Sequence, residues 1–183
     1  RAECRAMELT TSIILPALLA LGVPGQTAKA KPPVKFNNVQ YVHRYSKGNL
    51  HEYTPKNQPD LKKWTDMFTI NDYPQVKDGE GLASMANAVL ENYKGAKAMV
   101  VRTDSKPRTA TKPAEHLIVV LFPQPTFIEA AFTRLVMNGK QGASLVYSHR
   151  IYGTKAGDAM STWLKSNGEK IEKALMAMPV PKH

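Results

Sequence analysis

Cysteine is nearly absent from this chain, which contains a single one, Cys4. Cys4 lies ahead of an apolar segment that the sequence predicts to be removed on export. After that removal the chain would have no thiol group. A disulfide, a thiolate metal site and a cysteine nucleophile are therefore excluded for the mature protein.

Several motifs that carry familiar chemistry are also missing. The sequence has no glycine-rich phosphate loop, no serine in a nucleophile elbow, no His-Glu-x-x-His pair and no aspartate-rich calcium loop. No cofactor and no metal site are predicted. The chain has 183 residues, of which 43% are hydrophobic and 22% charged, and this composition favours one globular domain with its own core.

The one long apolar run, from Ile13 to Val23, is too short to span a bilayer and is interrupted by Pro16. The small residues Ala28 and Ala30 follow it at the spacing of a signal-peptidase site. The pattern predicts export to the periplasm or the cell exterior, with a tethering N-terminal helix as the alternative.

The expected organisation is therefore a signal peptide over residues 1–30 and a single α/β domain over residues 31–183, with a folded core at about 38–177. The formal net charge is +10, and loss of residues 1–30 would lower it to +9, because three basic and two acidic side chains leave. Such a charge attracts anionic partners without specifying a fold. In an exported protein we expect an anionic polymer, a membrane surface or an acidic protein as partner, rather than nucleic acid.

Basic residues gather between positions 94 and 113, where Asp104 is the only acid. We predict an anion-binding patch in this segment, formed by Arg102, Lys106, Arg108 and Lys112. A solvated loop with ordinary surface charges explains the same residues more simply.

Turn residues and short apolar runs predict mostly β-strands along the chain. The expected strands cover 39–45, 50–54, 63–70, 98–103, 117–122, 127–137 and 143–152. Leu117 to Phe122 is apolar without alternation, which indicates a central strand buried on both faces. Helical spacing predicts one helix from Leu82 to Tyr93, and a second that begins at the N-cap Asp158 and breaks near Asn167.

These elements predict an α+β fold in which an antiparallel sheet of about six to seven strands has helices on both faces. The order of elements resembles the PsbP-like α/β/α sandwich over about 39–176, and small exported bacterial proteins of unknown function even more closely. Four segments carry the resemblance: Trp64-Thr65-Asp66-Met67, Asn87 to Tyr93, Ser148 to Gly153 and Trp163-Leu164-Lys165.

The resemblance implies binding or assembly roles rather than catalysis, and it transfers no functional residue to this chain. A cystatin-like arrangement of one helix on a sheet is the alternative fold. The early hairpin and the closing helix argue against that alternative.

The last hairpin contains a candidate catalytic pair. If Met137 pairs with Ala143, then Glu129 and His149 share one face of the sheet. A carboxylate beside an imidazole suits general base catalysis or metal ligation, so this pair is the candidate site of a small hydrolase or metal-dependent enzyme. A hydrogen-bonded histidine at the edge of the core explains the pair more simply.

On the opposite face of the same hairpin, Arg150 near Arg134 is a candidate ligand for an anion. In the first hairpin, a pairing of Tyr45 with Leu50 would place His43 and His51 on opposite faces, so no zinc site is predicted there. The sequence thus favours a non-catalytic exported binding or assembly protein with a basic surface.

Overall fold

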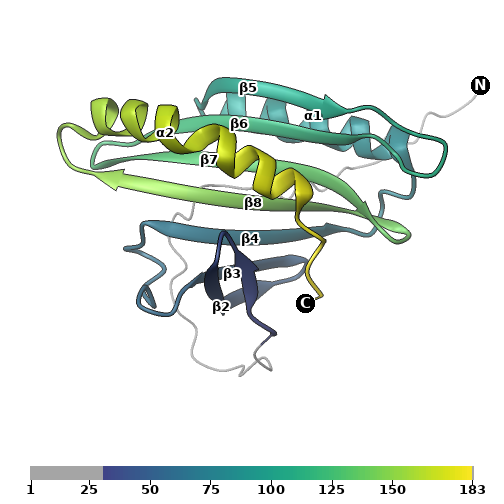
Figure 1. Cartoon of the computed structure of the whole chain (residues 1–183), viewed down its shortest axis with the longest axis horizontal. Coiled ribbons are helices and arrows are strands. Elements are labelled where there is room, and N and C mark those ends of the chain that lie inside the picture. Colours follow the sequence, from purple (N-terminus) through teal and green to yellow (C-terminus); the bar gives the residue numbers. More distant parts are fainter. Residues whose placement is uncertain (1–30, 183) are drawn as a thin grey trace, which may run out of the picture.

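The computed structural model describes residues 31–182, which form one curled antiparallel sheet of eight strands and two helices (Figure 1). The predicted signal peptide and Cys4 lie outside the described residues. Neighbouring strands follow the order β1-β2-β3-β4-β8-β7-β6-β5. The elements are β1 (Val34–Phe36), β2 (Val39–Lys47), β3 (Leu50–Pro55), β4 (Asp66–Tyr73), α1 (Gly79–Gly95), β5 (Met99–Lys106), β6 (Glu115–Pro123), β7 (Phe127–Asn138), β8 (Gln141–Tyr152) and α2 (Ala156–Ala177).

The two helices cover opposite faces of the sheet, α1 behind β5 and β6 and α2 in front of β7 in Figure 1. The apolar side of α1 packs on Ile118, Val120 and Leu135. The apolar side of α2 packs on the alternate residues of the same strands, such as Val119 and Phe132. The predicted α+β class is confirmed, and each face of the sheet has its own core because side chains alternate along a strand.

The apolar strand β6 is not central, as its composition had indicated, but lies next to the edge strand β5. Leu117 to Val120 are each at most 3% exposed. Both helices lie over this part of the sheet, so β6 is buried on both faces at a position near the edge. An unbroken apolar run is therefore expected both for a central strand and for a strand near the edge that helices cover on both faces.

A turn of two residues, Gly139 and Lys140, joins β7 to β8. Gly139 has φ of +63°, and glycine at the first position of a two-residue turn suits the twist of antiparallel strands. Met137 therefore pairs with Gly142, and the predicted pairing of Met137 with Ala143 is wrong by one residue. This single shift turns the alternate side chains of β8 to the other face relative to β7.

The short strand β1 brings the sheet to eight strands, where six to seven were predicted. Its turn to β2 consists of Asn37 and Asn38, with φ of 46° and 64°, which asparagine tolerates better than most residues. Val34 and Phe36 are 1% and 3% exposed. The core thus begins before residue 38.

A β-bulge between His43 and Tyr45 shifts the register of the first hairpin, so that Tyr45 pairs with Glu52. The two histidines expected on opposite faces instead reach the same serine. Ser46 Oγ lies 2.7 Å from His43 Nε2 and 2.8 Å from His51 Nδ1. The predicted separation of the histidines is therefore wrong.

The first helix begins where Asp78, as N-cap, accepts a hydrogen bond from the backbone N–H of Gly81. The second helix begins before the predicted cap, since Asp158 lies within its first turn. The expected break at Asn167 does not occur: the helix continues through Asn167 and Gly168 to Ala177, and the Asn167 side-chain amide donates to the Trp163 carbonyl within it. Within the described residues, neither helix has the length and apolar character needed to cross a membrane.

The C-terminal end of α2 is tied to the sheet by Arg134. Its guanidinium donates to the carbonyl oxygens of Leu175 and Met178 and pairs with Glu115 at 2.9 Å. Positive charge at this end of a helix complements the helix dipole. Arg134 therefore lies on the α2 face and not, as expected, beside Arg150.

Replacement of Val89 by Asp tests the core under α1. Val89 is 4% exposed, and an unpaired carboxylate there should cost about 3 kcal/mol or more of unfolding free energy, because it loses its hydration. Thermal or urea unfolding measures the loss. The matched variant Ala88→Asp, at an exposed position one residue earlier, should leave stability almost unchanged. An unchanged melting temperature for Val89→Asp would show that this face is not core.

Candidate functional site

The predicted catalytic pair, Glu129 and His149, is not formed. His149 pairs with Ala130, whereas Glu129 pairs with Arg150, so the two side chains lie on opposite faces of the sheet. The ring of His149 stacks on Trp163 of α2, which places it on the α2 face. The two-residue turn between β7 and β8 is the cause of this separation.

Glu129 forms a buried ion pair with Arg150. Glu129 Oε2 lies 2.8 Å from Arg150 Nε, and the two residues are 6% and 5% exposed. The guanidinium carbon lies 3.7 Å from the ring centre of Trp64 and 4.3 Å from that of Phe127. The charge of Arg150 is thus satisfied within the protein, and the predicted role in binding an anion finds no open surface there.

Arg102 and Lys106, two residues of the predicted anion-binding patch, are also engaged. Arg102 lies 2.8 Å from Asp104 and 3.1 Å from Glu172 of α2. Lys106 Nζ donates to the Met176 carbonyl at 2.6 Å. These contacts join the edge strand β5 to α2 and neutralise part of the predicted patch.

Arg108 and Lys112 complete that patch and lie on the exposed loop at 107–114 between β5 and β6. Neither side chain forms a hydrogen bond or ion pair within residues 31–182. The five residues predicted to bind anions are therefore not brought together. Only these two present free positive charge.

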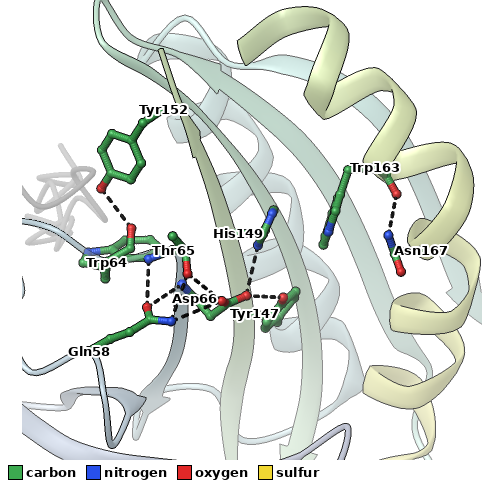
Figure 2. A network of polar contacts seen from close by, with 9 residues as sticks. All are labelled: Gln58, Trp64, Thr65, Asp66, Tyr147, His149, Tyr152, Trp163 and Asn167. Carbon is green, nitrogen blue, oxygen red and sulfur yellow. Dashed lines mark hydrogen bonds and ion pairs between the residues drawn. The ribbon is translucent and has the colours of Figure 1, made fainter. Parts of the chain in front are cut away.

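The carboxylate partner of His149 is Asp66 of β4, which the sequence did not indicate. Asp66 stands opposite His149 in the sheet, and its Oδ1 lies 3.0 Å from His149 Nδ1. The hydroxyl of Tyr147 donates to the same oxygen at 2.7 Å. Figure 2 shows the three side chains converging beside α2. An enzyme built on His149 would use Asp66 where the sequence predicted Glu129.

Asp66 is held as an anion by its surroundings. Its second oxygen accepts a hydrogen bond from Thr65 Oγ1 at 2.8 Å, and Gln58 Nε2 lies 3.4 Å away (Figure 2). Burial by itself raises the pKa of Asp66, but the hydrogen bonds from His149, Tyr147 and Thr65 outweigh burial and lower the pKa to about 2. The carboxylate is therefore ionised at any physiological pH.

The imidazole of His149 is held from two sides. Its ring and that of Trp163 have centres 4.0 Å apart and planes inclined by 7°. Because the ionised carboxylate of Asp66 can only accept, Nδ1 carries the proton of this hydrogen bond. Nε2 forms no hydrogen bond within the described residues, and the side chain is 15% exposed. Nε2 is thus the nitrogen that remains available to a ligand.

A pocket of about 290 Å³ opens beside Asp66. Its walls come from the β1–β2 hairpin, the loop after β3, and the strands β4 and β8; Asp66 and Tyr147 form part of the lining. Within residues 31–182, no three histidine, cysteine, aspartate or glutamate side chains are grouped so that they could hold a metal ion.

Asp66 was missed because the two strands that bring it to His149 are about 80 residues apart and no turn connects them. The segment Trp64 to Met67 had been singled out for its resemblance alone. The pairing of β4 with β8 follows from the whole sheet, and no local pattern reveals it.

The variant Asp66→Asn tests the ionised state of this carboxylate. The pKa of about 2 in the folded protein lies below the ordinary aspartate value of 3.8, so Asp66 stabilises the fold above pH 4 and loses that contribution as the pH falls toward 2. The stability gap between the native chain and Asp66→Asn should narrow by about 2 kcal/mol between pH 6 and pH 2 in urea unfolding. A constant gap for Asp66→Asn would contradict the assignment.

No known protein family matches the sequence, and no curated protein matches it. Among solved structures, the Saccharomyces cerevisiae Ran-binding protein Mog1p is similar, with 10% identity and a TM-score of 0.46 over 80% of this chain and 92% of that chain. Human STARD10 is similar with 10% identity and a TM-score of 0.30, over 76% of this chain and 74% of that chain. At these TM-scores neither likeness bears on function.

Proposed function

We propose that the protein is an exported, non-catalytic binding or assembly protein of PsbP-like architecture that meets an anionic partner through a basic surface. The observation that carries the proposal is the division of charge between paired acids and free bases. Residues 31–182 have a formal charge of +9. The positions of the acidic side chains determine which basic side chains carry this excess positive charge.

Most carboxylates of the domain are engaged by groups of the chain itself. Glu115 and Glu129 hold the buried guanidinium groups of Arg134 and Arg150. Others pair with basic side chains nearer the surface: Glu91, Asp104, Glu169 and Glu172. The excess positive charge is therefore carried by exposed lysine and arginine side chains that have no such partner.

Four of these side chains lie at one end of the sheet, called here the basic end: Lys77, Arg108, Lys112 and Lys140. They come from the segment before α1, the β5–β6 loop and the β7–β8 turn, and the last two segments are seen at the right in Figure 1. The N–H of Gly142 donates to the Val76 carbonyl at 3.0 Å, and a Cβ at Gly79 would lie 3.5 Å from that of Pro113. The hydrogen bond joins the segment before α1 to the start of β8, and the close approach at Gly79 places the same segment beside the β5–β6 loop.

The chemistry of the basic end fits an anionic polymer, an anionic membrane surface or an acidic protein. Lysine and arginine on flexible side chains attract such partners over a distance that depends on salt. Export, which the N-terminal pattern predicts, places the protein among these partners and away from nucleic acid.

Neutralisation of the basic end tests the proposal. The variant carrying Lys77→Gln, Arg108→Gln, Lys112→Gln and Lys140→Gln should bind at least about fourfold more weakly, because each of the four exposed contacts contributes about 0.2–1 kcal/mol. Binding is measured at several salt concentrations to a sulfated polysaccharide, to phosphatidylglycerol vesicles and to polyglutamate. Of the three ligands, the one that the native chain binds most tightly, with an affinity that falls as salt is added, identifies the chemical class of the partner.

A matched variant shows whether binding depends on the basic end itself or only on the net charge of the protein. Lys56, Lys62, Lys63 and Lys155 are exposed and lie at the other end of the sheet, in the loops before β4 and before α2. Their replacement by Gln removes the same charge and should leave binding nearly intact. Equal losses in the two variants, or no binding of the native chain to any of the three ligands, would contradict the proposal.

A further inference from the structure

The pocket beside Asp66 combines aromatic walls with one acidic group. Phe36, Tyr41 and Tyr147 line it together with Asp66. These three aromatic residues are 3%, 3% and 6% exposed, so the core holds them in place. The volume of about 290 Å³ equals that of about ten water molecules in the liquid, which is enough for a small organic ion.

The charge of Asp66 is not neutralised by any lysine or arginine of the described chain, although the sequence contains 25 of them. Its ion-pair partner is His149, which is charged only when protonated. Its remaining contacts are neutral: the hydroxyls of Tyr147 and Thr65 and the amide of Gln58. A partly buried anion with neutral neighbours favours a cation in the adjoining space.

Three polar side chains of the pocket lining form no hydrogen bond within the described residues. The side-chain amides of Asn37 and Asn57 line the pocket and form no hydrogen bond within the described residues. The hydroxyl of Tyr41 forms none either. Burial, and after it the charge of Asp66, raises the pKa of Tyr41, so the hydroxyl keeps its proton. These oxygens can accept hydrogen bonds from N–H groups of a bound cation.

We propose that this pocket binds a primary ammonium or guanidinium group carried on a short aliphatic chain. The charge of the ligand is placed at Asp66, its N–H groups meet the free amide and hydroxyl oxygens, and its methylene groups contact the aromatic rings. The pocket shares no residue with the basic end, so this site is independent of the anionic partner proposed above.

The probes are n-butylammonium and n-butylguanidinium, titrated into the full chain and followed through backbone amide shifts in NMR spectra. Both should bind, with the shifts centred on residues around Asp66. Tetramethylammonium, which has no N–H donor, and n-butanol, which has no charge, should bind at least about tenfold more weakly. Equal binding of n-butanol would overturn the proposal, because the pocket would then be merely apolar.

Two variants locate the site. Asp66→Asn keeps the shape of the side chain and should weaken n-butylammonium binding at least about tenfold. The control Glu80→Gln removes one charge from an exposed position on α1 and should leave binding unchanged.

If Asp66→Asn does not fold, the variant Val39→Trp tests the same site. Val39 lines the pocket and is 41% exposed, so a larger ring there fills the pocket while Asp66 itself is unchanged, and binding should again be lost. Unchanged affinity in either pocket variant would refute the site.

Two peptides distinguish the source of the cation. A Gly-Lys-Gly peptide blocked at both ends presents the ammonium group as a side chain, and Gly-norleucine-Gly is its uncharged control. Binding of the lysine peptide as tight as that of n-butylammonium would assign the pocket to a basic side chain of a partner protein. Binding of the free amine alone would assign it to a small amine. Failure of all the amines would refute this pocket but would not affect binding at the basic end.

Discussion

The turn of two residues between β7 and β8 is the constraint on which this structure depends. Gly139 in a left-handed conformation allows Asn138 to pair with Gln141, and that pairing decides which side chains of the two longest strands share a face. Phe132 and Tyr147 then turn to α2, and Leu135 turns to α1. A slip of one residue would exchange the side chains of β8 between the core under α1 and the core under α2.

The same constraint gives each face of the sheet its own charged pair. Under the α1 face, Arg150 and Glu129 are closed in by Trp64 and Phe127, so their charges satisfy each other. On the α2 face, Asp66 lines a pocket and pairs with His149, and its other side-chain donors are neutral. The Arg150–Glu129 pair is therefore enclosed in the core, whereas the carboxylate of the His149–Asp66 pair borders a pocket open to a ligand.

The sequence indicated the helices, the order of the elements and the need for cover on both faces, because apolar periodicity reports burial directly. The loop lengths predicted from the sequence were wrong at the hairpin turns. In two hairpins a glycine at the first turn position, Gly48 or Gly139, makes a loop of two residues where a longer one was predicted. In the candidate site, His149 was found and Asp66 was not, because pairing between distant strands leaves no local pattern.

A double-mutant cycle tests the central claim, that His149 is partnered by Asp66 and not by Glu129. Unfolding free energies are measured for Asp66→Ala, His149→Ala and the double variant, and for the same cycle with Glu129→Ala. The structure predicts a coupling of about 0.5–3 kcal/mol between Asp66 and His149, and close to none between Glu129 and His149. Coupling to Glu129 with none to Asp66 would contradict the register and the site built on it.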